Sequence, residues 1–246
     1  MDPTAQVRVK VPTTVPLFQA EAARLMKPLQ KYSKARLAKE MALSAKLADE
    51  TKLMTMKWGT EGSVLAPALF AFTGIVYMYV DVASWSAAQV RDANKRAVIL
   101  SGLYGSLRPL DLIAPYRLEM GSKFKPPRMK NLVAFWQERL TESLNSEMKM
   151  GEPIINLAAQ EYVKALDVKA LKGPIISPVF KEIRPDGSLK NAPVFAKMAR
   201  GAMVKFIFTT GAKKPADLMA FHDLGWEASE EPPSEGNWLF TRPVPE

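Results

Sequence analysis

A stretch of 21 residues, Ser101 to Gly121, constrains the fold more than any other part of the sequence. It reads SGLYGSLRPLDLIAPYRLEMG and sets three glycines and two prolines among apolar residues. Glycine admits backbone conformations closed to other residues, and proline fixes φ and lacks an N–H, so the stretch is a poor helix and a poor uniform strand. The pattern predicts a strand over 97–100, a tight turn over 102–105 and a second strand near 116–120. In that strand Tyr116, Leu118 and Met120 would share one face.

The same stretch carries two cations and two acids: Arg108, Asp111, Arg117 and Glu119. Buried charges are costly unless they are paired, so one interpretation is a structural network in which these residues neutralise one another. The alternative is a polar pocket in which Arg108 and Arg117 hold an anionic or nucleotide-like ligand. In that pocket Asp111 or Glu119 would be the catalytic acid or base. The residues alone leave both interpretations open.

Composition removes several kinds of chemistry. The chain of 246 residues has no cysteine, which excludes disulfides, iron–sulfur clusters and a cysteine nucleophile. Its single histidine, His222, removes most zinc and non-haem iron sites, which need several imidazoles. We therefore expect no cofactor and no metal site. With 48% hydrophobic and 24% charged residues, the balance is that of a globular protein in water.

No segment has the pattern of a signal peptide or a membrane span. The most apolar window, 64–82, is interrupted by Pro67, Thr73, Gly74 and Asp81. A spanning helix needs about 20 mostly apolar residues. The window is therefore predicted to be a buried helix followed by a strand near 74–77, and no membrane partner is expected.

The net charge of +9 is unevenly distributed. Residues 223–246 hold six acids and one arginine, so the first 222 residues carry +14. Between Arg24 and Trp58 there are nine lysines and arginines against three acids. Such density attracts phosphates and makes binding sensitive to salt, without indicating any sequence preference.

Residues 33–58 are predicted to form a basic helical hairpin. Ser33 is a good N-cap for a helix over 34–41, and Ser44 for a second helix over 45–57. In a helix-hairpin-helix motif the amides of the second helix face a phosphate. The residues that would contact nucleic acid here are Lys34, Lys39, Ser44, Lys46 and Lys52. The glycines usual in such hairpins are missing, so a plain packed hairpin is the alternative.

Two further groups of cations extend the predicted phosphate surface. An acid-free loop around Pro126-Pro127 carries four cations: Lys123, Lys125, Arg128 and Lys130. A helix predicted over 194–208 carries three: Lys197, Arg200 and Lys205. Together with the hairpin, these groups could line a cleft that follows a phosphate backbone. The alternative is that each is a solvated basic face.

The remaining elements follow from periodicity and turn residues. Helices are predicted over 16–29, 86–94, 132–148 and 161–171, and strands over 7–11, 153–158, 173–180 and 238–242. The order strand, helix, strand over 153–180 predicts a parallel crossover.

The stretch from Ser101 to Gly121, called the central block from here on, resembles the signature of the YaaA family of peroxide-stress proteins. Other segments in the same order strengthen the resemblance: VPTTVPLF (11–18), KNLVAFW (130–136), INLAAQEYVKAL (155–166), PVFKE (178–182) and AKMARGAM (196–203). The resemblance covers about 11–242, nearly the whole chain.

This resemblance implies a fold particular to the family and a role in protection against hydrogen peroxide. It also implies that the protein helps to keep free iron low and that it binds DNA, including duplexes of irregular structure. The sequence departs from the family at several positions. The Ser-Pro-Ala-Lys segment expected over 5–10 is absent, and Ala159 replaces a serine. Three other positions hold residues where the family has polar, small or basic ones: Ile75, Tyr79 and Met198. These losses weaken an enzymatic interpretation.

The sequence thus predicts one compact mixed α/β domain over 1–246, with a mixed central sheet surrounded by helices. The expected function is DNA binding in the peroxide response, through backbone contacts that help limit iron- and peroxide-dependent damage. The alternative is an enzyme that acts on a nucleic acid or a nucleotide through Arg108, Asp111, Arg117 and Glu119. We expect a monomer in the cytoplasm, or in an organelle if the source is eukaryotic.

Overall fold

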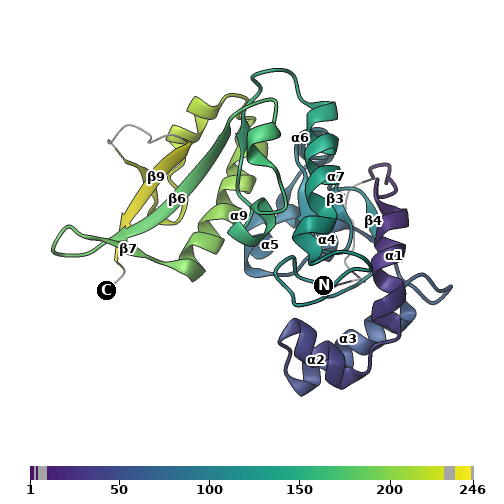
Figure 1. The fold of residues 1–246 in the computed structure, drawn as a ribbon. Helices are drawn as coiled ribbons and strands as arrows, with labels where there is room; N and C mark the ends of the chain where they lie inside the picture. The colour runs from purple at the N-terminus through teal and green to yellow at the C-terminus, as the bar shows by residue number, and fades with distance from the viewer. Residues whose placement is uncertain (3, 5–9, 230–235, 245–246) are drawn as a thin grey trace. The chain divides into compact units, whose positions relative to one another are not determined.

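Helices and short strands alternate along the chain in the computed structural model (Figure 1), which describes residues 1–2, 4, 10–229 and 236–244. Residues 7–9 of the strand predicted over 7–11 lie outside the described residues. The mixed α/β class predicted from the sequence is confirmed. The fold divides into two compact units, each built from three separate segments. The single domain predicted over 1–246 stays a prediction.

Unit 1 comprises 1–72, 94–147 and 158–171. Its helices are α1 (Gln19–Gln30), α2 (Lys34–Met41), α3 (Ala45–Lys57), α4 (Ala68–Ala71), α7 (Leu132–Glu147), α8 (Gln160–Val163) and the 3-10 turn η2 (Val168–Ala170). Its strands are β1 (Ala66–Pro67), β2 (Ile99–Ser101), β3 (Gly105–Leu107) and β4 (Leu112–Ile113). They form two antiparallel pairs, β1 with β4 and β2 with β3.

Unit 2 comprises 73–93, 148–157 and 172–246. Its helices are α5 (Ile75–Val80), α9 (Pro193–Thr210) and the 3-10 turns η1 (Val82–Ser84), η3 (Pro215–Ala220) and η4 (Asp223–Gly225). Its strands are β5 (Ile154–Ile155), β6 (Ile175–Ile183), β7 (Leu189–Asn191), β8 (Glu227–Ala228) and β9 (Asn237–Pro243). Helix α6 (Ala87–Arg96) begins in unit 2 and ends in unit 1.

The two helices predicted for the basic hairpin are present, with the predicted caps. The Ser33 hydroxyl accepts a hydrogen bond from the Arg36 N–H, and the Ser44 hydroxyl accepts one from the Leu47 N–H. Ala42 joins the helices in the left-handed region, with φ of 52°. Its position is the helix C-cap, where glycine is usual. The two helices pack side by side beyond the end of α1 (Figure 1).

The central block folds as the β2–β3 hairpin, then strand β4, which pairs with β1, and then a segment without strand pairing. β2 and β3 flank the turn, and the Ser101 hydroxyl accepts hydrogen bonds from the N–H groups of Leu103 and Tyr104. Gly105 has φ of 69°, and an added Cβ would lie 2.5 Å from the Trp136 ring, so only glycine fits there. The hairpin is thereby fixed against α7.

The second strand predicted in the block, near 116–120, is wrong. Tyr116, Leu118 and Met120 are buried and Glu119 is exposed, so the predicted alternation holds. No strand pairs with this segment among the described residues, however, and the Tyr116 N–H donates to the Met1 sulfur instead. Alternation shows which side chains face the core, whereas a strand also needs a hydrogen-bonding neighbour.

The strand predicted near 74–77 is also wrong, because these residues begin helix α5. Its sequence, IVYMYV, is rich in β-branched and aromatic residues, which favour strands. Packing overrides this preference, since α5 lies against α9, where Gly201 lets the two backbones approach closely. The helix predicted over 161–171 is shorter than expected and is divided into α8 and η2.

Unit 2 contains the mixed sheet that the sequence predicts. β5 and β9 both pair parallel with β6, whereas β7 pairs antiparallel with β6 and β8 with β9. Phe180 and Phe240 lie opposite each other in the β6–β9 register and pack with Phe221 and Trp226. All four aromatic rings are buried, and helix α9 contacts β6.

Replacing Gly201 with alanine should destabilise unit 2. The new Cβ would lie 2.1 Å from the Val76 carbonyl oxygen, so α5 and α9 would have to move apart. Overpacking of this kind costs about 1–3 kcal/mol. Urea unfolding should show a loss of about 2 kcal/mol, because alanine's helix preference offsets part of the cost. Gly74→Ser, at a site with open space around the Cβ, is the control and should change stability little.

Candidate nucleic-acid interface

The hairpin cations predicted to contact phosphate differ in their surroundings. Lys34 forms an ion pair of 2.6 Å with Asp49, in which both side chains are more than half exposed. Such surface pairs contribute about 0–1 kcal/mol, so a phosphate can compete with Asp49 for the ammonium group. Lys39 and Lys46 are exposed, and no described residue forms an ion pair with them. The Ser44 hydroxyl caps α3, as described above.

Lys52 has a structural position instead. Its ammonium group donates to the carbonyl oxygens of Gln30 and Tyr32, at 2.8 and 2.9 Å. These carbonyls end α1, where a cation also meets the negative end of the helix dipole. Lys52 therefore ties α3 to the end of α1. Its predicted contact with phosphate stays a prediction.

The loop over 123–130 alternates anchors with cations. Phe124 and Pro126 are buried, whereas the four cations of the loop are exposed: Lys123, Lys125, Arg128 and Lys130. The Lys123 N–H donates to the Glu40 carbonyl oxygen at 2.8 Å, and the Phe124 ring packs edge-on against Tyr32. The loop is thus held beside the hairpin and the end of α1.

A tight turn presents Arg128 at the tip of this loop. The Met129 N–H donates to the Pro126 carbonyl oxygen at 3.0 Å, and Arg128 has φ of 64°. Proline at the second position and positive φ at the third are the pattern of a type II turn, in which glycine is usual at the third position. A non-glycine residue there costs about 1–2 kcal/mol. The chain therefore keeps a guanidinium group at a position that favours glycine.

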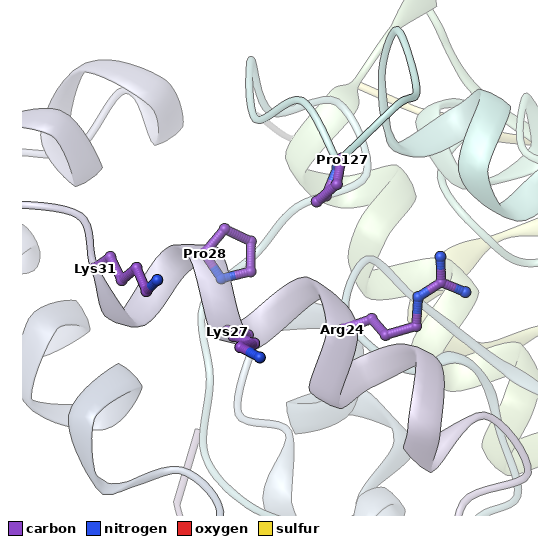
Figure 2. Close-up of a pocket in the computed structure, with 5 residues that line it drawn as sticks. All are labelled: Arg24, Lys27, Pro28, Lys31 and Pro127. Carbon is purple, nitrogen blue, oxygen red and sulfur yellow. The ribbon is translucent and has the colours of Figure 1, made fainter.

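Helix α1 and this loop enclose a basic groove, shown in Figure 2. The groove has a volume of about 330 Å³, and its lining residues are Arg24, Lys27, Pro28, Lys31 and Pro127. The three cations follow one side of α1, and Pro127 approaches from the loop across from Pro28 (Figure 2). No acid lines the groove, so its electrostatic potential favours anions.

Arg24 is also placed by stacking. Its guanidinium carbon lies 5.9 Å from the centre of the Phe135 ring, and that of Arg139 lies 4.9 Å from the same ring. The aromatic ring draws these cations toward α7 without neutralising them. Arg24 therefore remains available to an anion in the groove.

The three groove cations are not among the residues that the sequence predicts to contact nucleic acid. Arg24, Lys27 and Lys31 were counted only within the basic excess of 24–58. Their spacing of three and four residues places them on one helical face, and this signal could have identified them. The loop that completes the groove is about a hundred residues further along the chain.

The third predicted group lies in unit 2. Lys205 pairs with Asp81 at 2.8 Å, Lys197 is exposed, and burial lowers the pKa of the Arg200 guanidinium. The contact of these three residues with nucleic acid stays a prediction.

The four charges of the central block do not form one cluster. Asp111 is buried and accepts hydrogen bonds from the Thr14 hydroxyl, at 2.6 Å, and from the Arg108 N–H, at 2.7 Å. The Arg108 side chain forms an ion pair with Glu147, and burial lowers its pKa, an effect that Asp111 opposes.

Arg117 and Glu119 stand apart from that pair. Glu119 is exposed, and the buried Arg117 Nε finds no hydrogen-bond partner among the described residues. The Arg108 guanidinium thus pairs with Glu147, outside the central block, and Asp111 accepts from the Arg108 backbone N–H, so the four residues do not neutralise one another as a group. The crevice beside Arg108 and Asp111 has a volume of about 30 Å³, room for one or two water molecules.

The two units differ strongly in charge. Unit 1 contains 22 lysines and arginines against 13 acids, whereas unit 2 contains 12 of each. The whole net charge of the chain thus belongs to the unit that holds the hairpin, the loop and the groove.

In the described part of unit 1, no aromatic ring is exposed.

Two further features are absent from the part of the chain that the structure describes. Within the described residues, no group of three or more histidine, aspartate or glutamate side chains is placed to hold a metal ion. None of the helices in the same residues has the length and apolarity that a membrane crossing requires.

These features define a mixed α/β protein with one strongly basic unit and a groove lined by cations. Comparison with known proteins gives the family. The model of the peroxide stress protein YaaA family matches residues 1–232, and the chain belongs to that family. The resemblance stated from the sequence is thereby confirmed.

Relatives of similar length occur in several bacteria under the name UPF0246 protein. The chain is 40% identical to one from Flavobacterium johnsoniae over 231 residues, which cover 93% of this chain and 91% of the relative. It is 39% identical to one from a Janthinobacterium over 233 residues, covering 93% and 90%. A relative from Polynucleobacter necessarius is 41% identical over 227 residues, covering 90% and 86%.

Proposed function

We propose that this protein binds duplex DNA through the phosphate backbone, as its part in the peroxide stress response. The observation that carries the proposal is the basic groove, which is lined by Arg24 and Lys27 of α1 and by Lys31 at its C-cap, with no acid among the lining residues. Seven residues of helix rise about 10 Å, so these cations can follow several phosphates of one strand.

The hairpin and the loop extend this groove. Lys39 and Lys46 are exposed on the hairpin, and Lys125, Arg128 and Lys130 on the loop. The contact between Lys123 and Glu40 holds the two elements together. Phosphates are thus met by side chains from three elements of unit 1. Contacts of this kind fix a protein on DNA without reading its sequence.

The absence of exposed aromatic rings in the described part of unit 1 favours a duplex over a single strand. Proteins that bind single strands combine a basic groove with aromatic rings on which bases stack. A surface of cations and prolines offers charge and shape only. Bound along the duplex, the protein would shield it from iron- and peroxide-dependent damage, in keeping with the family's role.

The enzymatic alternative has no comparable support. Of its four candidate residues only Arg108 and Asp111 lie together, and the crevice of about 30 Å³ beside them is too small for a nucleotide. We therefore do not propose it as a second function.

Fluorescence anisotropy with labelled DNA at several salt concentrations tests the proposal. With about six phosphate contacts, the logarithm of the duplex binding constant should fall by about five for each tenfold rise in salt. Plain duplex, flapped duplex and single strand should be compared, and single strand should bind most weakly. Duplex binding that is absent at low salt, or that ignores salt, would contradict the proposal.

Arg128→Gly should change stability and binding in opposite directions. Glycine relieves the positive φ at Arg128, so the free energy of unfolding should rise by about 0.5–1 kcal/mol. One phosphate contact is lost, so duplex affinity near 0.1 M salt should fall about tenfold. Arg128→Lys is the matched control, because it keeps both the charge and the strain. A stabilised glycine variant with unchanged affinity would remove Arg128 from the interface.

A further inference from the structure

Met129 lies in the loop that lines the basic groove, two residues after the lining residue Pro127. Its N–H donates to the Pro126 carbonyl oxygen and closes the turn. Met129 is 39% exposed and stands between Arg128 and Lys130 in the sequence. A thioether at this place contributes no charge to phosphate binding. The residue is nevertheless partly exposed to solvent and adjacent in sequence to two cations of the proposed interface.

Methionine is the group of this chain that peroxide oxidises. The chain has no cysteine and 13 methionines, so oxygen transfer from peroxide falls on thioether sulfur. Five of the described methionines are exposed: Met56, Met78, Met129, Met150 and Met219. Of these five, Met129 is the one in the loop that lines the groove.

We propose that Met129 is an oxidation site through which hydrogen peroxide weakens the hold of the basic groove on DNA phosphates. This inference rests on the proposed function. In the reaction the sulfur attacks one peroxide oxygen, a sulfur–oxygen bond forms and the oxygen–oxygen bond breaks. The sulfur loses two electrons to the peroxide, and the departing hydroxide takes the remaining peroxide proton and leaves as water.

The product changes the polarity of the loop that lines the groove. Oxidation turns a flexible apolar side chain into a polar one whose oxygen accepts hydrogen bonds. The nearest strong donors along the chain are Arg128 and Lys130, which the phosphate also needs. The sulfoxide oxygen competes for these donors and brings a partial negative charge next to the phosphate. Affinity should therefore fall by about three- to tenfold, and the upper end is the effect of losing one phosphate contact. Methionine sulfoxide reductases reverse the change.

The experiment compares the intact protein before and after treatment with hydrogen peroxide. Peptide mass spectrometry measures sulfoxide at each methionine, and anisotropy measures affinity for a plain duplex. Met129→Leu keeps an apolar side chain that peroxide does not oxidise, and Met129→Gln imitates the polar product. Met150→Leu removes the thioether with the largest exposure, 82%, from unit 2 and is the control.

We expect oxidised wild type and Met150→Leu to lose affinity, and Met129→Leu to keep it. Untreated Met129→Gln should bind like oxidised wild type, and a mixture of the two sulfoxide reductases should restore wild-type affinity. Equal losses in Met129→Leu and wild type would overturn the inference, as would full oxidation of Met129 with unchanged affinity. Failure of untreated wild type to bind duplex would overturn the proposed function itself, which separates the two failures.

Discussion

Replacing Arg24, Lys27 and Lys31 together with glutamine should weaken duplex binding by about two to three orders of magnitude near 0.1 M salt. Each phosphate that a cation neutralises releases about 0.9 counterion, so three lost contacts lower the salt slope by about 2.7. The three side chains are exposed, so the fold should be retained. Anisotropy over a range of salt concentrations measures both the affinity and the slope.

The matched control removes the same charge from unit 2. Lys149, Arg184 and Lys190 are all exposed there, and their replacement with glutamine also lowers the net charge by three. Binding that depends on the groove should leave this control with a slope close to that of wild type. If both triple variants lost the same affinity, overall charge rather than the groove would carry the binding. The groove would then be an incidental feature of the surface.

Local features of the structure could be predicted because their causes lie close together in sequence. Ser33 and Ser44 each cap a helix through a residue three positions later, which is a pattern that the sequence shows directly. The alternation of burial over 116–120 could be predicted equally well, because it depends on side-chain chemistry alone. The basic hairpin and loop were found for the same reason.

Other features depend on residues far apart in the chain and could not be predicted in this way. The residues of α5 prefer strand locally, and their helix is decided by α9, more than a hundred residues later. The groove likewise needs α1 and Pro127 side by side. Arg108 has its ionic partner in Glu147, at the end of α7, so the sequence could place its charge but not its neighbour.

The largest effect on stability should come from Arg242. Its guanidinium group donates to the Glu182 carboxylate at 2.8 Å, and Glu182 is only 2% exposed. The guanidinium carbon also lies 4.2 Å from the centre of the Phe195 ring and 4.7 Å from that of Trp226. Arg242→Met would leave the buried carboxylate without its counter-charge, and such uncompensated charges cost about 3–5 kcal/mol.

A set of variants separates charge from packing at this site. Glu182→Gln should cost less than Arg242→Met, because Arg242 is more exposed than Glu182 and its cation can keep partial contact with water. The double variant Glu182→Met/Arg242→Met removes both charges and should recover much of the stability, as buried ion pairs replaced by apolar residues often do. Lys205→Met, which breaks an exposed pair with Asp81, should cost less than about 1 kcal/mol. Urea unfolding followed by tryptophan fluorescence measures all four. A double variant as unstable as Arg242→Met would show that the stacking of the guanidinium between Phe195 and Trp226, rather than the ion pair, holds this part of unit 2 together.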